Sequence, residues 1–310
     1  MELISKSNKA TVSNVKTYDF STLYTSIPHS KLKTAIAWTI KKAFLGRGKK
    51  YIHVYKTRTC WSDTKMKSDG AGVQVTQKVL LNMVHYLIDN IFVTCGETVF
   101  RQAIGIPMGT DCAPFLANLF LFFYEFRFME KMTKEKSPDL YRFRKVARYL
   151  DDLIIVNGGD VMEKYSSDIY PCELILKLEN TNDQACTFLD LSLNVNVDNR
   201  KIEHKLYDKR DDFSFEIVNY PNLQGNICTT NAFGVLIGQL LRIANACQQY
   251  DDFLERSRCL IHKLVTQFFP KRGFVSRLIK FYKRYPHKVS KYGITLQSFV
   301  KDLDPLKEWN

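Results

Sequence analysis

The stretch Arg148-Tyr149-Leu150-Asp151-Asp152-Leu153-Ile154-Ile155-Val156 sets two adjacent carboxylates in an otherwise largely apolar segment. The pattern predicts a strand, a turn at the aspartates and a second strand. Neighbouring carboxylates repel each other, so one must take up a proton unless a cation lies nearby. A divalent metal ion meets that need best. The stretch therefore predicts a metal site on an antiparallel sheet.

A further carboxylate, Asp19, ends another predicted strand in Lys16-Thr17-Tyr18-Asp19-Phe20-Ser21. Two-metal phosphoryl transfer needs shared carboxylates, because one ion activates the attacking oxygen and the other stabilises the leaving oxygen. Asp19, Asp151 and Asp152 are therefore the candidate catalytic residues. The chain's other Asp-Asp pairs, at 211–212 and 251–252, are interpreted as solvated charges.

Composition favours a polyanionic partner. The chain has 310 residues, is 45% hydrophobic and carries a formal net charge of +13. Nucleic acid is the leading candidate, although charge alone would also suit a membrane surface or a ribosome. The eight cysteines show no zinc-ligand spacing and no disulfide framework, which favours a reducing, intracellular location. The longest apolar run, 115–123, is too short to span a bilayer, and we expect no membrane association and no zinc.

The pattern elsewhere predicts an α+β chain. Helices are expected at 28–44 and 74–90, with an exposed excursion at about 45–73 between them and a hairpin at 91–103. Gly105–Asp111 should open a deeply buried helix that runs to about residue 132. An antiparallel ribbon is predicted at 189–197 and 202–206, and helices beyond 221.

The C-terminal part is rich in basic residues, and no acid occurs between Arg256 and Lys291. Aromatic residues are interleaved with them and could anchor the fold or stack on bases: Phe268, Phe269, Phe274, Phe281, Tyr282, Tyr285 and Tyr292. This composition is typical of a module that grips a nucleic-acid backbone, although a solvated helical face has the same charges. We draw a domain boundary between residues 212 and 213.

These pieces, in this order, resemble the palm and thumb of a reverse transcriptase. Residues 19–28 are similar to the first palm motif of Penelope-like retroelements and related uncharacterised animal retroelement proteins, and 102–114 to the second. Residues 148–152 resemble the third, and 187–191 with 205–210 resemble the family's segments after the third motif. The resemblance implies a right-hand polymerase palm, an antiparallel sheet backed by helices over residues 1–212, followed by a mainly helical thumb at 213–310.

The resemblance also implies an enzyme, an RNA-directed DNA polymerase. Asp19, Asp151 and Asp152, with the carbonyl of Phe20, would bind two Mg²⁺ ions, for which Mn²⁺ could substitute. Tyr24 would be the steric gate that selects deoxynucleotides. The nucleotide-binding residues would be Tyr24, Gln102, Gly105, Pro107, Met108 and Gly109. The partners would be an RNA template, a DNA primer and dNTPs.

The basic residues implied to bind nucleic acid are Lys205, Lys209, Arg210, Lys263, Lys271, Arg272, Arg277, Lys280, Lys283 and Arg284. Only eighteen residues precede Asp19, so the fingers are expected to be largely missing, apart from the 45–73 insertion, and the copy to be N-terminally truncated. A protein partner supplying fingers or an endonuclease is left open. Lys271-Arg272 could mimic a nuclear signal, so nucleus and cytoplasm both stay open, with the nucleus preferred.

Two other hypotheses remain. One is a catalytically inactive, truncated retroelement fragment that only binds nucleic acid. The other is an RNA-synthesising polymerase, which Tyr24 disfavours. The departure Thr110-Asp111 after the second motif's glycine adds a negative charge near the expected nucleotide site.

Overall fold

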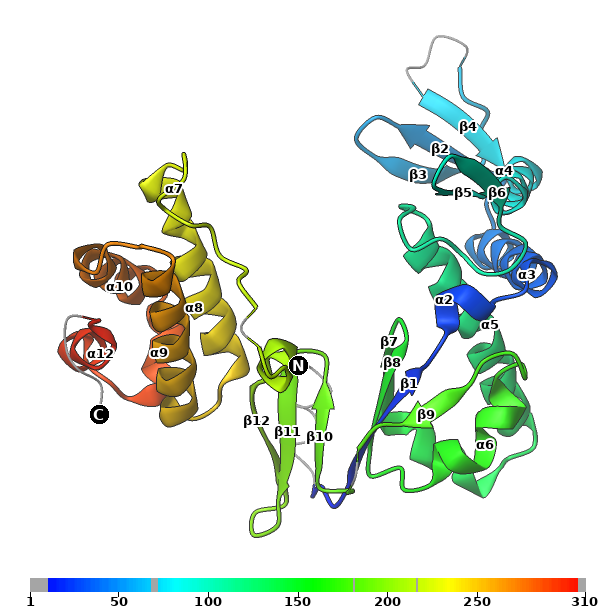
Figure 1. Ribbon diagram of the computed structural model, residues 1–310. Helices are drawn as coiled ribbons and strands as arrows, with labels where there is room; N and C mark the ends of the chain where they lie inside the picture. The colour runs from blue at the N-terminus through cyan, green and yellow to red at the C-terminus, as the bar shows by residue number, and fades with distance from the viewer. Residues whose placement is uncertain (1–10, 68–71, 181, 216, 306–310) are drawn as a thin grey trace. The chain divides into compact units, whose positions relative to one another are not determined.

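The computed structural model describes residues 11–67, 72–180, 182–215 and 217–305, and the chain forms two compact units (Figure 1). The first unit spans residues 16–179. The second combines the described residues before 16 with those from 180 onward. The division lies at residue 180, earlier than the boundary drawn at 212/213. The antiparallel ribbon predicted at 189–197 and 202–206, which we assigned to the palm, therefore belongs to the same unit as the C-terminal helices. As a division by function, the 212/213 boundary stays a prediction.

The first unit is built on a four-stranded sheet with the order β7-β8-β1-β9. The strands are β1 (Val15–Phe20), β7 (Val146–Tyr149), β8 (Asp152–Val156) and β9 (Leu176–Leu178), and β7/β8 and β1/β9 pair antiparallel. Side chains alternate between the faces of a strand. Phe20 and Leu153 share one hydrophobic core with helices α5 (Ala113–Lys134) and α6 (Val161–Ile169). The neighbouring Asp19 and Asp152 therefore face the opposite side of the sheet.

Helix α3 (His29–Arg47) confirms the helix predicted at 28–44. Its four-residue apolar repeat, Leu32, Ile36, Ile40 and Phe44, is buried. It follows the one-turn helix α2 (Leu23–Ser26), and Pro28 caps it in an extended conformation. The fixed proline φ suits that boundary position.

Helix α5 begins and ends close to the predicted bounds, but the prediction that it lies deep on all sides was wrong. Phe120 and Leu121 are fully buried, whereas Phe115 is 71% exposed. Phe122 and Phe126 are also exposed. Helix α5 is hydrophobic on all sides, but only one face is buried and an aromatic face is exposed to solvent.

The 45–73 excursion is a three-stranded sheet with the order β3-β2-β4. Its strands are β2 (Tyr51–Tyr55), β3 (Thr59–Ser62) and β4 (Gly72–Thr76). Because 72–76 pairs as a strand, the following helix α4 spans Gln77–Asp89 and starts later than predicted. The predicted hairpin is confirmed as β5 (Phe92–Cys95) and β6 (Thr98–Arg101).

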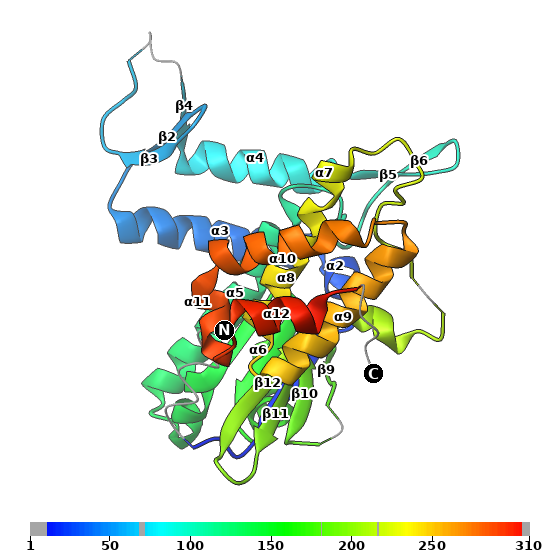
Figure 2. The same ribbon diagram turned by 90° about the vertical axis from the view of Figure 1, so that its left-hand side faces the viewer.

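The second unit combines a ribbon with helices. The predicted ribbon is confirmed as β11 (Leu191–Asn196) and β12 (Lys201–Leu206), and β10 (Ala185–Phe188) adds a third strand. Leu189 lies in the β10–β11 turn with φ of 56°, not in a strand. The helices are α7 (Thr229–Ala232), α8 (Gly234–Ala246), α9 (Tyr250–Thr266), α10 (Arg272–Arg284), α11 (Pro286–Val289) and α12 (Leu296–Leu303) (Figure 2).

The aromatic residues of this unit mostly build its core. Phe253, Phe274, Phe281 and Phe299 are fully buried, and Phe269 is nearly so. Helix α10 packs on α8 and α12 (Figure 2). The Phe299 ring lies 6.1 Å from both the Phe253 and the Phe281 ring, centroid to centroid. Of the two roles expected for the aromatic residues, anchoring the fold is confirmed for Phe269, Phe274 and Phe281, whose burial leaves no face for a base, whereas Phe268 is exposed.

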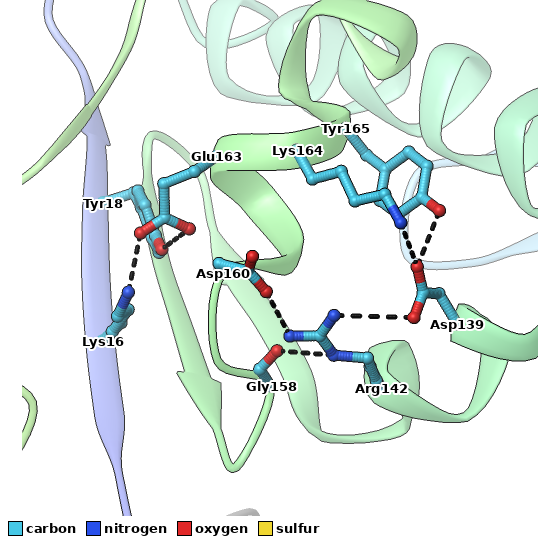
Figure 3. Close-up of polar contacts among 9 residues, drawn as sticks. All are labelled: Lys16, Tyr18, Asp139, Arg142, Gly158, Asp160, Glu163, Lys164 and Tyr165. Atoms are coloured by element: carbon cyan, nitrogen blue, oxygen red, sulfur yellow. Dashed lines mark hydrogen bonds and ion pairs between the residues drawn. The ribbon is translucent and has the colours of Figure 1, made fainter.

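A polar network closes the far end of β8 in the first unit (Figure 3). Arg142, in the 3-10 helix η1 (Pro138–Lys145), donates to the Gly158 carbonyl at 2.9 Å and pairs with Asp160 at 2.5 Å. Asp139 accepts from Lys164 and Tyr165, both at 2.7 Å. The network ties η1 to the β8–α6 turn and to α6.

This network should make stability depend on pH in acid. Lys164, then Tyr165, lower the pKa of Asp139 to about 2 from an ordinary value of 3.8. A carboxylate with a depressed folded-state pKa stabilises the fold fully above its unfolded pKa, and the contribution is lost as pH falls through the folded value. Asp139→Asn should therefore lower the melting temperature by a constant amount above about pH 5, and the difference should shrink between about pH 4 and 2.

Thermal melts of both proteins across that pH range measure the effect. Asp168→Asn, which removes an exposed carboxylate from the neighbouring helix α6, is the control and should leave the melting temperature nearly unchanged. A difference between wild type and Asp139→Asn that persists unchanged to pH 2 would contradict the account.

Candidate active site

The Asp151-Asp152 turn lies against the end of β1. Tyr149 pairs with Asp152, so Leu150 and Asp151 form the hairpin loop, and Leu150 adopts a left-handed φ of 55°. The Phe20 N–H donates to the Asp151 carbonyl at 3.4 Å. The Asp151-Asp152 turn therefore lies beside the end of β1 that carries Asp19, and a site shared by the three carboxylates stays a prediction.

The donor set fits magnesium in its chemistry. All three carboxylates are half-buried and offer hard oxygen ligands. Across the described ranges, no three His, Cys, Asp or Glu side chains are grouped closely enough to hold a metal ion by themselves. Mg²⁺ commonly uses one or two carboxylates and completes its shell with water and substrate phosphates. The carboxylates therefore enclose no ion by themselves in the described ranges, and the two-metal site stays a prediction.

Tyr24 lies beside this turn. It is half-buried on α2, and burial raises the pKa of its phenol above the ordinary value. The negative charge of Asp151 raises that pKa further. The Tyr24 phenol and the Asp151 carboxylate are therefore close enough to interact electrostatically, and the gate role of Tyr24 stays a prediction.

The Gly105 loop docks onto the segment that carries Tyr24. The Gly105 N–H donates to the Ile27 carbonyl at 2.8 Å, and the Ile106 N–H donates to the Tyr24 carbonyl at 2.6 Å. Gly105 has φ of +84°, and a Cβ built there would lie 2.5 Å from the Tyr24 oxygen. Only glycine can make this approach without a shift of the backbone.

Two side chains support the loop. Gln102 Nε2 donates to the Ile104 carbonyl at 2.8 Å, in agreement with its predicted supporting role, and His29 Nε2 lies 2.8 Å from the Gly105 carbonyl oxygen. No signal in the sequence pointed to a role for His29. Pro107 is half-buried, whereas Met108 and Gly109 are exposed in the turn before α5. The predicted nucleotide-binding residues thus divide into a docked group and an exposed group.

The ten predicted nucleic-acid-binding residues divide into three groups. Three of them are paired with acids: Lys205 with Asp252 at 3.4 Å, Arg210 with Asp208 at 2.5 Å and Lys263 with Asp211 at 3.4 Å. The acid-free stretch from Arg256 to Lys291 is therefore partly neutralised by acids from outside it. Lys209, Lys271, Arg272 and Lys283 are exposed.

The remaining three cations are brought together on α10. Arg277, Lys280 and Arg284 line a cavity of about 510 Å³ with Thr230 and Ser276. The Arg277 guanidinium lies over the Phe233 ring, 4.5 Å from its centroid, so its position is fixed. We call Arg277, Lys280 and Arg284 the α10 basic cluster. Its charge and hydroxyl lining suit an anionic partner.

No helix in the described part of the chain has the length and hydrophobicity needed to cross a membrane. All eight cysteines lie in the described part of the chain, and none of them forms a disulfide.

No protein-family model and no curated protein matches the chain. Among solved structures, it is similar to telomerase from Candida albicans in complex with a TWJ fragment of telomeric RNA, with a TM-score of 0.59 and 13% identity over 97% of this chain and 51% of that one. Apo telomerase from Candida tropicalis aligns with a TM-score of 0.45 and 14% identity over 98% of this chain and 47% of that one. The chain spans about half the length of these telomerases.

The Candida albicans likeness, with the sheet and helices described above, defines the fold class. The chain has a reverse-transcriptase-like polymerase fold, with antiparallel strands backed by helices and a mainly helical C-terminal part. The predicted α+β fold class is confirmed. The likeness shows the fold alone.

Proposed function

We propose that the chain is an RNA-directed DNA polymerase of Penelope-like retroelement origin. The observation that carries the proposal is the contact between the Asp151-Asp152 turn and the Asp19 strand, made by the Phe20 N–H and the Asp151 carbonyl. The motif order in the sequence and the reverse-transcriptase-like fold support it. Extension of a DNA primer on an RNA template with dNTPs and Mg²⁺ tests it.

In this proposal Asp19, Asp151, Asp152 and the Phe20 carbonyl hold two Mg²⁺ ions, or Mn²⁺ in their place. Bound metal would supply activation of the primer 3′-hydroxyl and charge neutralisation of the leaving pyrophosphate. The chain's own contribution is positioning: the sheet end orients the carboxylates, and the docked Gly105 loop orients the nucleotide beside Tyr24. Gln102, Pro107, Met108 and Gly109 complete that wall.

Tyr24 should decide the sugar. Its ring, beside Asp151, would clash with a 2′-hydroxyl and exclude ribonucleotides. Tyr24→Ala should raise the ratio of kcat/KM for rNTP to that for dNTP by roughly 100-fold, since a steric clash in a packed pocket is worth a few kcal/mol. Single-nucleotide incorporation with matched rNTP and dNTP measures the ratio. Tyr24→Phe, which keeps the ring, is the control, and an equal change in both variants would rule out a steric gate.

The α10 basic cluster would grip the template–primer duplex through its phosphates. Lys280→Gln/Arg284→Gln should make the negative slope of log K against log[salt] shallower by about 2, because each lost phosphate contact removes roughly 0.9 from its magnitude. Fluorescence anisotropy with an RNA–DNA hybrid measures that slope. The control is Lys201→Gln/Lys301→Gln, which removes two exposed charges from the same unit. Equal slopes for the two double variants would contradict a role for the cluster.

The second candidate function, nucleic-acid binding without catalysis, rests on the same cluster. It predicts salt-sensitive duplex binding without extension. We further propose that the chain acts inside the cell, in the nucleus by preference, since Lys271 and Arg272 are exposed in a basic segment.

A further inference from the structure

The guanidinium of Arg148 is fully engaged behind the aspartate turn. Its Nε and Nη2 donate to the two carboxylate oxygens of Glu125 on α5, at 2.6 and 3.1 Å. Its Nη1 donates to Asn118 Oδ1 at 2.6 Å and to the Leu150 carbonyl at 2.8 Å. A planar fork of donors can serve such a set of acceptors together, which an ammonium cannot. The side chain is only 10% exposed.

Glu125 is itself fixed from a third element. The Tyr170 hydroxyl donates to Glu125 Oε1 at 2.9 Å. Burial, with the charge of Glu125, raises the pKa of Tyr170 well above its ordinary value, so the phenol stays protonated as a donor. The Tyr170 ring packs edge-on against Phe20, with centroids 4.8 Å apart. The network thus connects α5, the hairpin and the strand that carries Asp19.

Arg148 donates to the carbonyl of a residue with a left-handed backbone conformation, Leu150. Leu150 has φ of 55°, a conformation that costs a residue with a side chain about 1–2 kcal/mol. Such strain persists only where the surroundings enforce it, and it concentrates at functional turns. Because Arg148 pairs with Leu153 across the hairpin, it shares the helix-covered face with Leu153. Tyr149 and Asp152 share the opposite face.

We propose that Arg148 is a positioning residue that holds the Asp151-Asp152 turn from the back of the sheet, with Glu125 and Tyr170 as its supports. The role rests on the proposed function, because it sets the carboxylates for metal and nucleotide. Arg148 does not touch the reacting atoms. Its effect passes through the Leu150 carbonyl to the two aspartates that come next in the chain.

The chain offers a matched control at the other end of β8. Arg142 also uses its guanidinium to hold a turn carbonyl, that of Gly158, and to pair with two carboxylates, those of Asp139 and Asp160 (Figure 3). Its side chain is 20% exposed, similar to Arg148. Arg142→Lys and Arg148→Lys therefore remove comparable networks from the two ends of one strand.

Hydrogen exchange on the full chain tests the proposal without need of activity. Arg148→Lys should speed exchange of the Phe20, Asp151 and Asp152 amides by about tenfold or more, and leave 157–160 unchanged. Arg142→Lys should speed exchange of the amides at 157–160 and leave those of Phe20, Asp151 and Asp152 unchanged. Unchanged exchange at 151–152 in Arg148→Lys, or an equal rise there in Arg142→Lys, would overturn the proposal. If Arg148→Lys does not fold, Glu125→Gln gives the same comparison, because it weakens the support of the fork.

A second readout separates this proposal from the proposed function. Mn²⁺ affinity, measured by calorimetry, should fall roughly 10–100-fold in Arg148→Lys, as expected when a group that orients a ligand is lost, and stay unchanged in Arg142→Lys. Wild-type protein that binds no Mn²⁺ would count against the metal role of the aspartates. The exchange experiment would still decide whether Arg148 holds the turn.

Discussion

Asp151→Asn is expected to lower the rate of nucleotide addition by at least about 100-fold, the order of loss seen when one group that stabilises transition-state charge is removed. The substitution keeps the shape of the side chain but removes a metal-binding charge. Folding should survive, because Asp151 lies in the hairpin loop and the Phe20 contact uses its backbone carbonyl. Single-turnover extension on an RNA template, with circular dichroism melts, measures both quantities.

Asp251→Asn is the matched control for Asp151→Asn. Asp251 is exposed in the first turn of α9 and also stands first in an Asp-Asp pair. It should leave the extension rate within about twofold, because exposed substitutions away from a site rarely matter. Retained activity in Asp151→Asn, or equal loss in Asp251→Asn, would remove the basis for the catalytic assignment.

Gly105→Ala is expected to have the largest effect on stability, lowering the free energy of unfolding of the first unit by roughly 2–4 kcal/mol. The new Cβ would lie 2.5 Å from the Tyr24 carbonyl oxygen and 2.9 Å from the Thr25 Cα, and the backbone would keep a φ of +84°. Both contacts are backbone atoms, so they cannot turn away. The loop must leave the Tyr24 segment, and nucleotide addition should fall with it. Urea denaturation monitored by tryptophan fluorescence measures the stability.

Gly109→Ala is the control in the same loop. No atom lies within 4 Å of a Cβ built at Gly109, and its φ is not left-handed. We expect a change in unfolding free energy below about 0.5 kcal/mol. A similar loss in both variants would show that the loop tolerates no side chain anywhere, and that the Tyr24 contact is not what makes Gly105 special.

The hydrophobic pattern of the sequence predicted single strands and helices well. The apolar strand-turn-strand pattern around Asp151 and the four-residue repeat of Leu32, Ile36, Ile40 and Phe44 can each be read within a short segment, and the structure has both. The exposed face of α5 could not be predicted in this way. Whether Phe115 is covered depends on how far the neighbouring elements reach, which the helix sequence does not encode.

The C-terminal basic residues show the same limit. Lys263 lies in a stretch without acids, yet Asp211, far away in sequence, pairs with it. Phe274 and Phe281 look available for stacking when read along the chain, but they share one helix face and fill the core. Long-range pairing decides both points, and a single sequence does not reveal it.

One residue of the network behind the aspartate turn, Glu125, stands out in the sequence. Glu125 is an acid inside the apolar stretch of α5, and an acid in such a place needs a partner. Arg148, next to the Tyr-Leu-Asp-Asp turn, is that partner. The sequence motif includes Arg148 but does not indicate its partner.

The most direct test of the central claim is extension of a DNA primer on an RNA template with the four dNTPs. The wild-type chain is run beside Asp151→Asn/Asp152→Asn, with and without Mg²⁺. The account predicts Mg²⁺-dependent extension by the wild type and none by the double variant, with both proteins binding the duplex equally. Duplex binding without extension by the wild type, in Mg²⁺ or Mn²⁺, would contradict it and leave a nucleic-acid-binding protein with a polymerase fold.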